Sequence, residues 1–205
     1  MSDEAILKEL RDLTKDREHW KSSIGHVAEY LDDYYSNEVK AKALWLLGEM
    51  GLKYPGEIEG HVDDIASYLD DDNPKLRQRS ANALGRIGRA NHNLVTPHLY
   101  NLMELRHDGS ANVRHAFVWA CENIATNAPE LFCEKLDMFY ELISDSNDKV
   151  RIEAPEMFRV IAKRKPEYVK PYLERLEWIG ENDENRIVRI HAKGAIRATE
   201  KTLKN

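Results

Sequence analysis

The sequence is poor in the residues that make tight turns and covalent cross-links. It holds ten glycines, seven prolines and two cysteines in 205 residues, whereas average usage is about 7% Gly and about 5% Pro. So few turn residues disfavour an all-β sandwich and favour helices. Cys121 and Cys133 are too few for a disulfide framework and belong to no metal-ligand spacing. We therefore expect two buried, reduced thiols.

Excess positive charge and long apolar runs are also missing. The net charge of −6 has the wrong sign for a protein whose whole surface binds nucleic acid. The most apolar stretch, Ala43 to Leu52, contains Glu49 and is shorter than the ~20 residues of a membrane span. No basic-then-apolar signal pattern opens the sequence. We expect a soluble, cytoplasmic protein without a membrane partner.

Sequence motifs of catalysis are absent as well. The sequence contains no phosphate-binding glycine loop, no dinucleotide fingerprint, no nucleophile elbow and no HExxH pair. His115 and His191 are each followed by alanine, and we expect them to lie on helix surfaces rather than to bind metal. The sequence thus predicts no catalytic residue, no cofactor and no metal site, so we do not expect an enzyme.

What the chain does contain is one segment repeated five times. The copies occupy residues 39–51, 76–88, 113–125, 150–162 and 188–200, and their first residues are 37, 37, 37 and 38 positions apart. Counted from each first residue, positions 0, 4, 7, 8 and 11 are small or apolar in nearly every copy. This spacing is typical of one face of an amphipathic helix. A second apolar stripe lies between successive copies, so each repeat is expected to be a pair of helices that must stack on its neighbours.

An aspartate and an arginine also recur at the turn within each pair. The aspartate lies five residues before the start of the copy and the arginine one residue after it. The pairs are Asp71 and Arg77, Asp108 and Arg114, Asp145 and Arg151, and Asp183 and Arg189. In the first copy Tyr34 and Lys40 take these two places. We expect the carboxylates to cap the helices and to accept from the arginines in a structural ladder. A phosphate-binding stripe is the alternative.

The repeated pattern resembles that of the HEAT-repeat family, within the armadillo and HEAT group of helical repeats. The second copy carries it most clearly, and prolines in two first helices add to it: Asp71, Leu76, Arg77, Ala83, Leu84, Gly85, Ile87, Gly88, Pro97 and Pro171. The resemblance covers roughly residues 20 to 203. It implies an all-α fold, a right-handed α-α superhelix or α-solenoid of about five helix pairs. It also implies a scaffold whose second helices line a concave groove that holds a partner.

We therefore expect a single HEAT-repeat domain over residues 1–205. An N-terminal capping helix at 1–16 is followed by helix pairs at 17–53, 54–90, 91–127, 128–164 and 165–205. Ile6, Leu10 and Leu13 would form the apolar face with which the first helix covers the end of the stack. The alternative is that this helix swings out and binds a partner.

Polar and aromatic side chains on the opposite face of the second helices are the candidate binding site. In the geometry of the family they line the concave groove, and they are Trp45, Glu49, Arg79, Asn82, Arg86, Trp119 and Asn123. Tryptophan and arginine dominate interface energetics. We expect a monomer whose groove takes an extended segment or a helix of another protein. The Trp119 and Asn123 pair is similar to the tryptophan and asparagine ladder of armadillo proteins.

Three alternatives stay open for this surface. The two tryptophans can pack on their neighbours and bind nothing. The residues Trp45, Glu49, Arg86 and Trp119 are also of the types, and in the order, that HEAT-like alkylpurine DNA glycosylases use. In that case the carboxylate would oppose an oxocarbenium-like sugar and arginine would grip phosphate. HEAT-like bilin lyases are a further possibility, although no chromophore-binding thiol stands out.

Overall fold

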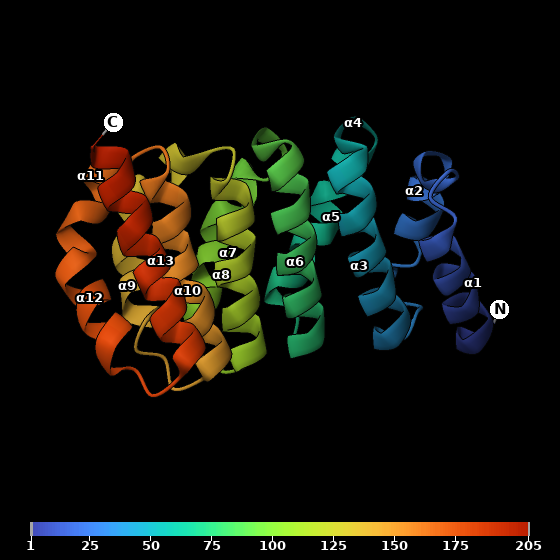
Figure 1. Ribbon diagram of the computed structural model, residues 1–205. Helices are drawn as coiled ribbons and strands as arrows, with labels where there is room; N and C mark the ends of the chain where they lie inside the picture. Colours follow the sequence, from blue (N-terminus) through green and yellow to red (C-terminus); the bar gives the residue numbers. More distant parts are fainter. Residues whose placement is uncertain (1, 205) are drawn as a thin grey trace. The chain divides into compact units, whose positions relative to one another are not determined.

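The computed structural model describes residues 2–204, and these form helices and turns with no strand (Figure 1). The chain divides into two compact units, Met1–Leu105 and Arg106–Asn205. The boundary falls within the expected third repeat, between its two helices.

Unit 1 holds two long second helices and several shorter segments. Its helices are α1 (Asp3–Lys15), α2 (Trp20–Glu29), α3 (Asn37–Lys53), α4 (Pro55–Ile58), α5 (Val62–Ser67), α6 (Pro74–Ala90) and α7 (Leu99–Glu104). Short 3-10 turns stand at Glu59–His61, Tyr68–Asp70, His92–Leu94 and Thr96–His98. Helices α3 and α6 pack side by side along their length (Figure 1).

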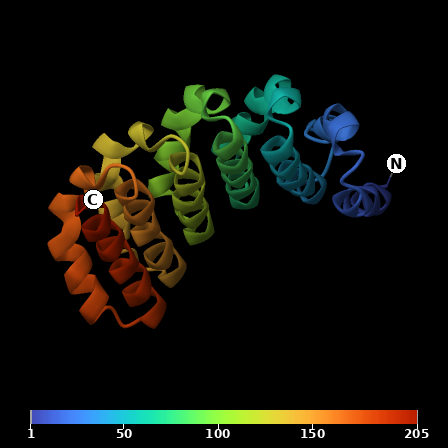
Figure 2. The same cartoon turned by 45° about the horizontal axis from the view of Figure 1, so that its top comes forward.

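Unit 2 repeats the arrangement. Its helices are α8 (Ala111–Ala125), α9 (Leu136–Leu142), α10 (Asp148–Ala162), α11 (Pro166–Val169), α12 (Leu173–Asn182) and α13 (Arg186–Leu203). It has 3-10 turns at Pro129–Leu131, Cys133–Lys135 and Lys170–Tyr172, and the turn Leu105–His107 spans the boundary between the units. Helix α10 packs between α8 and α13, and Figure 2 shows α10 and α13 side by side.

The repeated sequence segments coincide with α3, α6, α8, α10 and α13. The residues that open the five segments (Val39, Leu76, Val113, Val150 and Val188) are all fully buried. The helical periodicity read from the sequence is therefore confirmed. Both cysteines are also buried and free, as expected.

The first helices of the repeats are shorter than one continuous stripe suggests. Several are broken into short α-helical and 3-10 pieces, with Pro97 and Pro171 inside two of the 3-10 turns. Proline lacks the backbone donor that a continuing α-helix needs. The apolar spacing survives these breaks, because 3-10 turns keep the chain on the same side of the core.

Helix α1 lies against α3, with Ile6 and Leu10 buried. The indole Nε1 of Trp20 donates to the carbonyl of Leu13 at 2.8 Å, which ties the end of α1 to α2. In the part of the chain that the structure describes, no helix is long and apolar enough to cross a membrane.

Glycine at position 48 permits the close approach of α3 to α6. A Cβ at Gly48 would lie 2.7 Å from the Cα of Ala83, a backbone atom that cannot turn aside. We expect Gly48→Ala to lower the free energy of unfolding by about 1–3 kcal/mol, because overpacking outweighs the gain in helix propensity.

Gly25, inside α2, is the matched control, since a Cβ there would meet nothing within 4 Å. Gly25→Ala should leave stability unchanged or raise it by up to about 1 kcal/mol. Urea denaturation of both variants measures the difference. Equal effects at the two positions would contradict this account of the packing.

Candidate functional site

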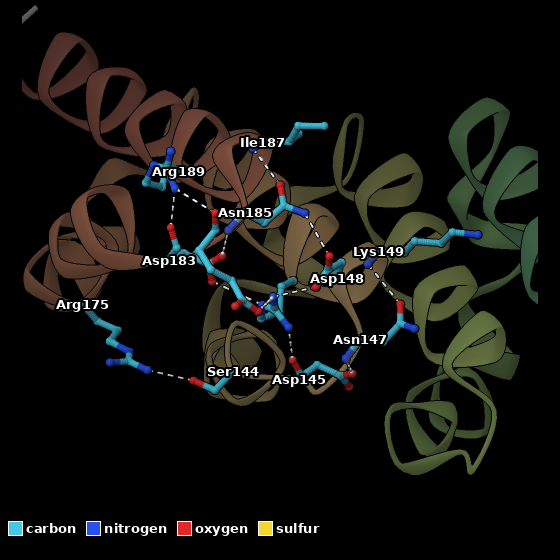
Figure 3. A network of polar contacts seen from close by, with 12 residues as sticks. Ser144, Asp145, Asn147, Asp148, Lys149, Arg175, Asp183, Asn185, Ile187 and Arg189 are labelled. Carbon is cyan, nitrogen blue, oxygen red and sulfur yellow. Dashed lines mark hydrogen bonds and ion pairs between the residues drawn. The ribbon is translucent and has the colours of Figure 1, made fainter.

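Two of the recurring arginines of unit 2, Arg114 and Arg151, join successive turns. Figure 3 shows the turn residues of this network, among them Asp145, Asp183 and Asn185. Arg114 on α8 donates to both carboxylate oxygens of Asp145, from Nε at 2.7 Å and from Nη2 at 2.8 Å. Its Nη1 donates to the carbonyl of Asp108 in its own repeat at 2.8 Å. Arg151 on α10 donates from Nε to one carboxylate oxygen of Asp183 at 3.2 Å and from Nη1 to the carbonyl of Asp145 at 3.0 Å, while its Nη2 donates to Asp148 at 2.6 Å. Each arginine thus holds its own turn and the next one.

The turn aspartates do not cap the helices directly. Their Oδ1 atoms accept from the backbone N–H two residues later, at 2.7–2.8 Å, in Asp71, Asp108, Asp145 and Asp183. The residue reached in this way is the N-cap of the following helix, and Asn73, Asn147 and Asn185 then cap α6, α10 and α13 with their own side chains. The aspartate therefore holds the asparagine in place, and the asparagine, which stands at the N-cap position, accepts from the helix.

The other recurring basic residues are Arg77, Arg189 and Lys40. The two arginines donate to backbone carbonyls, and Lys40 pairs with an aspartate one position away from the repeated one. Arg77 donates to the carbonyls of Asp71 and Asp72 at 2.7 and 3.0 Å. Arg189 donates to the carbonyls of Asp183 and Glu184. In the first copy, Lys40 pairs with Asp33 at 2.8 Å, one residue before Tyr34.

Within unit 1, the candidate binding residues of α3 and α6 separate into two groups. Glu49 and Arg86 form an ion pair with one another, at 2.7 Å between Oε1 and Nε. Asn82 lies on α6 between Arg79 and Arg86 and is partly buried. Trp45 and Arg79 belong instead to the lining of a pocket nearer the N-terminal ends of the two helices.

This pocket, called the α3/α6 pocket below, has a volume of about 640 Å³. Its lining comes from the first turns of α3 and α6, and it consists of Asn37, Glu38, Ala41, Lys42, Trp45, Asn73, Lys75 and Arg79. The volume falls within the range of ligand pockets in proteins, roughly 300–1,000 Å³. Three of the lining side chains are cationic and one is acidic.

One of the cations of the pocket, Lys42, lies over the indole of Trp45. The Nζ of Lys42 lies 4.1 Å from the centroid of that ring and donates to Thr14 Oγ1 on α1 at 2.8 Å. Burial, followed by the charges of Arg79 and Arg11, lowers the pKa of Lys42. Burial and then the charge of Arg79 lower the pKa of Lys75. Both lysines are therefore partly removed from water and lie near other positive charges, and each of these effects disfavours the protonated form.

The sequence pattern did contain a signal for these residues. Lys42 and Arg79 both stand three residues after the start of their copies, and Lys75 stands one residue before its copy. Position 3 lies next to position 6, where Trp45 stands, on the same helix face. Arg79 was among the predicted residues, but we singled out position 6 for its tryptophans and therefore missed Lys42 and Lys75.

In unit 2 the candidate residues Trp119 and Asn123 lie on α8. Trp119 is partly buried, whereas only 6% of Asn123 is exposed. The side-chain Nδ2 of Asn123 donates to the carbonyl of Trp119 at 2.9 Å. This bond lies within one helix turn and holds the amide against its own backbone.

The same face of unit 2 is acidic. Glu153 on α10 is hydrogen-bonded to Glu122 on α8, and burial, the bond to Glu122 and the negative charges of Glu122 and Glu156 raise the pKa of Glu153 to about 8. Glu156 is paired with Arg159 at 2.5 Å and lies 3.1 Å from His191 Nδ1. His115 Nε2 lies 3.8 Å from Glu153. Over the described residues, no group of histidine, cysteine and acidic side chains has the geometry to hold a metal ion.

An exposed aromatic cluster on the first helices of unit 2 was not predicted. Tyr140 on α9 lies 5.6 Å from Tyr172, measured between ring centroids, and Arg175 stacks 4.6 Å from the ring of Trp178 on α12. These four residues line a hollow of about 510 Å³. Sequence periodicity carried no signal for it, because the first helices are broken and their outward positions do not repeat.

The fold defines the class of protein. A designed armadillo repeat protein in complex with the peptide (KR)4 superposes with a TM-score of 0.73 at 22% identity, over 94% of this chain and 86% of the other. An engineered protein gives a TM-score of 0.74 at 21% identity, with 98% and 94% covered. UNC-45 from Drosophila melanogaster gives 0.72 at 17% identity, covering 92% of this chain and 27% of its own. The chain is an armadillo/HEAT-type α-solenoid, as the sequence predicted.

The family follows from the sequence comparison. The family model described as sister chromatid cohesion protein PDS5 matches residues 10–177. The chain belongs to this family of HEAT-like repeats. Among curated proteins, none matches.

Proposed function

We propose that the chain is a non-catalytic scaffold that holds a segment of a partner protein against its second helices, with the α3/α6 pocket as the principal contact. The pocket carries the proposal: a partly buried tryptophan forms its wall at the N-terminal ends of two packed helices. A large aromatic ring in a hollow of this size is the typical anchor of a binding hot spot.

Similar folds support a binding role. One similar structure is a designed armadillo repeat protein in complex with a peptide, and another is of computationally designed armadillo repeat proteins for modular peptide recognition. The family's description refers to sister chromatid cohesion, so proteins of chromosome cohesion are the first candidates as partners. Trp119 on unit 2 is a second proposed contact on the same kind of helix face.

The glycosylase alternative finds no comparable support. It assigns Glu49 to the sugar and Arg86 to phosphate, whereas these two side chains form an ion pair with one another. The carboxylate charge is therefore already opposed by a guanidinium.

Truncation of the tryptophan tests the proposal. We expect Trp45→Ala to weaken binding of the partner about thirtyfold or more, because a buried hot-spot tryptophan contributes ~2 kcal/mol or more. Affinity capture with mass spectrometry identifies the partner, and titration of the purified pair measures the loss. Trp178→Ala, which removes a 52%-exposed tryptophan far from the pocket in sequence, is the control and should bind normally.

A photoreactive residue locates the contact. Introduced in place of Glu38, an exposed residue of the pocket lining, it should cross-link the partner. The same residue in place of Glu57, which is exposed on α4 outside the pocket, should not. Normal partner binding by a folded Trp45→Ala variant, with no cross-link from position 38, would exclude the α3/α6 pocket as the contact.

A further inference from the structure

An excess of positive charge distinguishes the α3/α6 pocket, which is lined by three cationic side chains and one acidic side chain, Glu38. Arg79 is partly buried, and burial lowers its pKa, yet no ion pair involves it in the described part of the chain. Lys42 donates to the neutral Thr14 and Lys75 to the neutral Gln78, at 2.8 and 3.2 Å. By contrast, Arg114 and Arg151 of unit 2 each hold a carboxylate.

Two further features make the pocket suitable for anions. The N-terminal ends of α3 and α6 both reach it, since Asn37 opens α3 and Asn73 caps α6. Helix N-termini carry partial positive charge. The first turn of α6 has no acidic residue and instead has Lys75. Arg11 on α1 adds a fourth positive charge, close enough to act on Lys42.

The remainder of the chain makes this concentration of charge unusual. The net charge is −6, and the corresponding face of unit 2 carries Glu122, Glu153 and Glu156. Cations that are partly removed from water and have no anionic partner destabilise the folded chain, and a bound anion relieves this cost. A bound carboxylate would gain charge-assisted hydrogen bonds from Lys75 and Arg79. Charge complementarity therefore favours an anionic group as the ligand of the pocket.

We infer that the α3/α6 pocket binds an acidic segment of the partner protein, with aspartate or glutamate side chains at Lys42, Lys75 and Arg79 and an apolar part of the segment on the indole of Trp45. This inference rests on the proposed function and deepens it by stating the partner's chemistry. A protein segment is favoured over nucleic acid because the pocket offers three or four cations, whereas duplex binding commonly uses about 6–10 phosphate contacts.

A pair of labelled peptides tests the inference. Fluorescein-labelled (ED)4 and (KR)4 are titrated with the full chain at low salt, and anisotropy is measured. We expect (ED)4 to bind, (KR)4 not to bind, and the affinity for (ED)4 to fall as salt is raised. Binding of (KR)4 at the pocket, or equal binding of both peptides, would overturn the inference.

Variants that remove positive charge test whether (ED)4 binds at the α3/α6 pocket. Lys75→Gln combined with Arg79→Gln should weaken (ED)4 binding about tenfold, the expected loss for one exposed and one partly buried cation. Lys163→Gln combined with Arg164→Gln removes the same charges from two exposed positions of unit 2 and should leave the affinity within about twofold. Thermal melting confirms that both variants fold. An unchanged affinity in the pocket variant would refute the assignment.

Two outcomes separate the inference from the proposed function. If the photoreactive residue at position 38 cross-links a partner segment without acidic residues, the pocket binds protein and the acidic inference is wrong. If an oligothymidine binds in a way that Lys75→Gln and Arg79→Gln abolish, and (ED)4 does not bind, the ligand is a nucleic acid and both proposals fail.

Discussion

Replacement of Arg114 by alanine is expected to lower the free energy of unfolding by about 3–5 kcal/mol, the range for breaking a buried ion pair from one side. The reason is the carboxylate left behind. The side chain of Asp145 is 6% exposed and that of Arg114 15% exposed. Without the guanidinium, Asp145 would keep the backbone N–H of Asn147 but lose both hydrogen bonds of the bidentate pair. Urea denaturation at neutral pH measures the loss.

Two control variants show whether the bidentate geometry matters. Arg114→Lys keeps the charge but cannot form the planar pair, so it should fall between wild type and Arg114→Ala. Arg164→Ala removes an exposed arginine of the same unit and should change stability by less than about 0.5 kcal/mol. A similar small effect for Arg114→Ala would mean that the ladder contributes little to the fold.

The effect of Arg114→Ala should depend on pH. Burial would raise the pKa of Asp145, but hydrogen bonds from Arg114 and the Asn147 backbone, and the charges of Arg114 and Arg151, bring it below its usual value. A carboxylate with a lowered folded pKa contributes stability that is present above the unfolded pKa, near ~4, and is lost as pH falls through the folded pKa. The difference between wild type and variant should therefore shrink in acid.

Replacement of Glu153 by glutamine is expected to stabilise the chain in alkali. The pKa of Glu153 is raised to about 8 by burial first, and then by Glu122 and Glu156. A carboxyl with a raised folded pKa contributes stability that is fully present below its unfolded value, ~4.3, and is lost as pH rises to the folded value. Glutamine keeps the shape and a hydrogen-bond donor toward Glu122 without ionising.

Stability curves at two pH values measure this effect. Near pH 9, Glu153→Gln should raise the free energy of unfolding by about 2–4 kcal/mol, whereas near pH 5 the two proteins should differ little. Glu141→Gln, at an exposed position of α9, is the control and should change stability by less than about 0.5 kcal/mol at either pH. An alkaline gain no larger than that of the control would contradict the raised pKa of Glu153.

The second helices could be predicted from the sequence because the residues that they bury recur at a regular spacing. Val39, Leu76 and Val113 recur at a spacing of 37 residues, and each marks the start of a helix face that packs on a neighbour. An asparagine or serine stands at the N-cap of every second helix, but we expected the preceding aspartates to be the caps, and that prediction was wrong. The broken first helices were not predicted, because an apolar stripe looks the same across a 3-10 turn.

The α3/α6 pocket could be predicted only in part. Trp45 and Arg79 were identified from their helix positions, and they do meet in one pocket. The contribution of Lys42 depends on a cation–π contact and on Thr14 of α1, a residue 28 positions away. Pairings such as Glu49 with Arg86 have the same limitation: helical periodicity says which residues share a face, but not which partners on another helix neutralise them.

The arginine contacts of unit 2 give the solenoid a direction. Arg114 and Arg151 each reach a carboxylate of the next turn, 31 or 32 residues farther along the chain, and Arg151 also pairs with Asp148 in its own helix. Truncation from the C-terminal side after α8 therefore leaves a stub in which Arg114 has lost the carboxylate of Asp145. Truncation from the N-terminal side leaves an unpaired aspartate instead. The first stub keeps its charge at every accessible pH, whereas the second is relieved by protonation in acid.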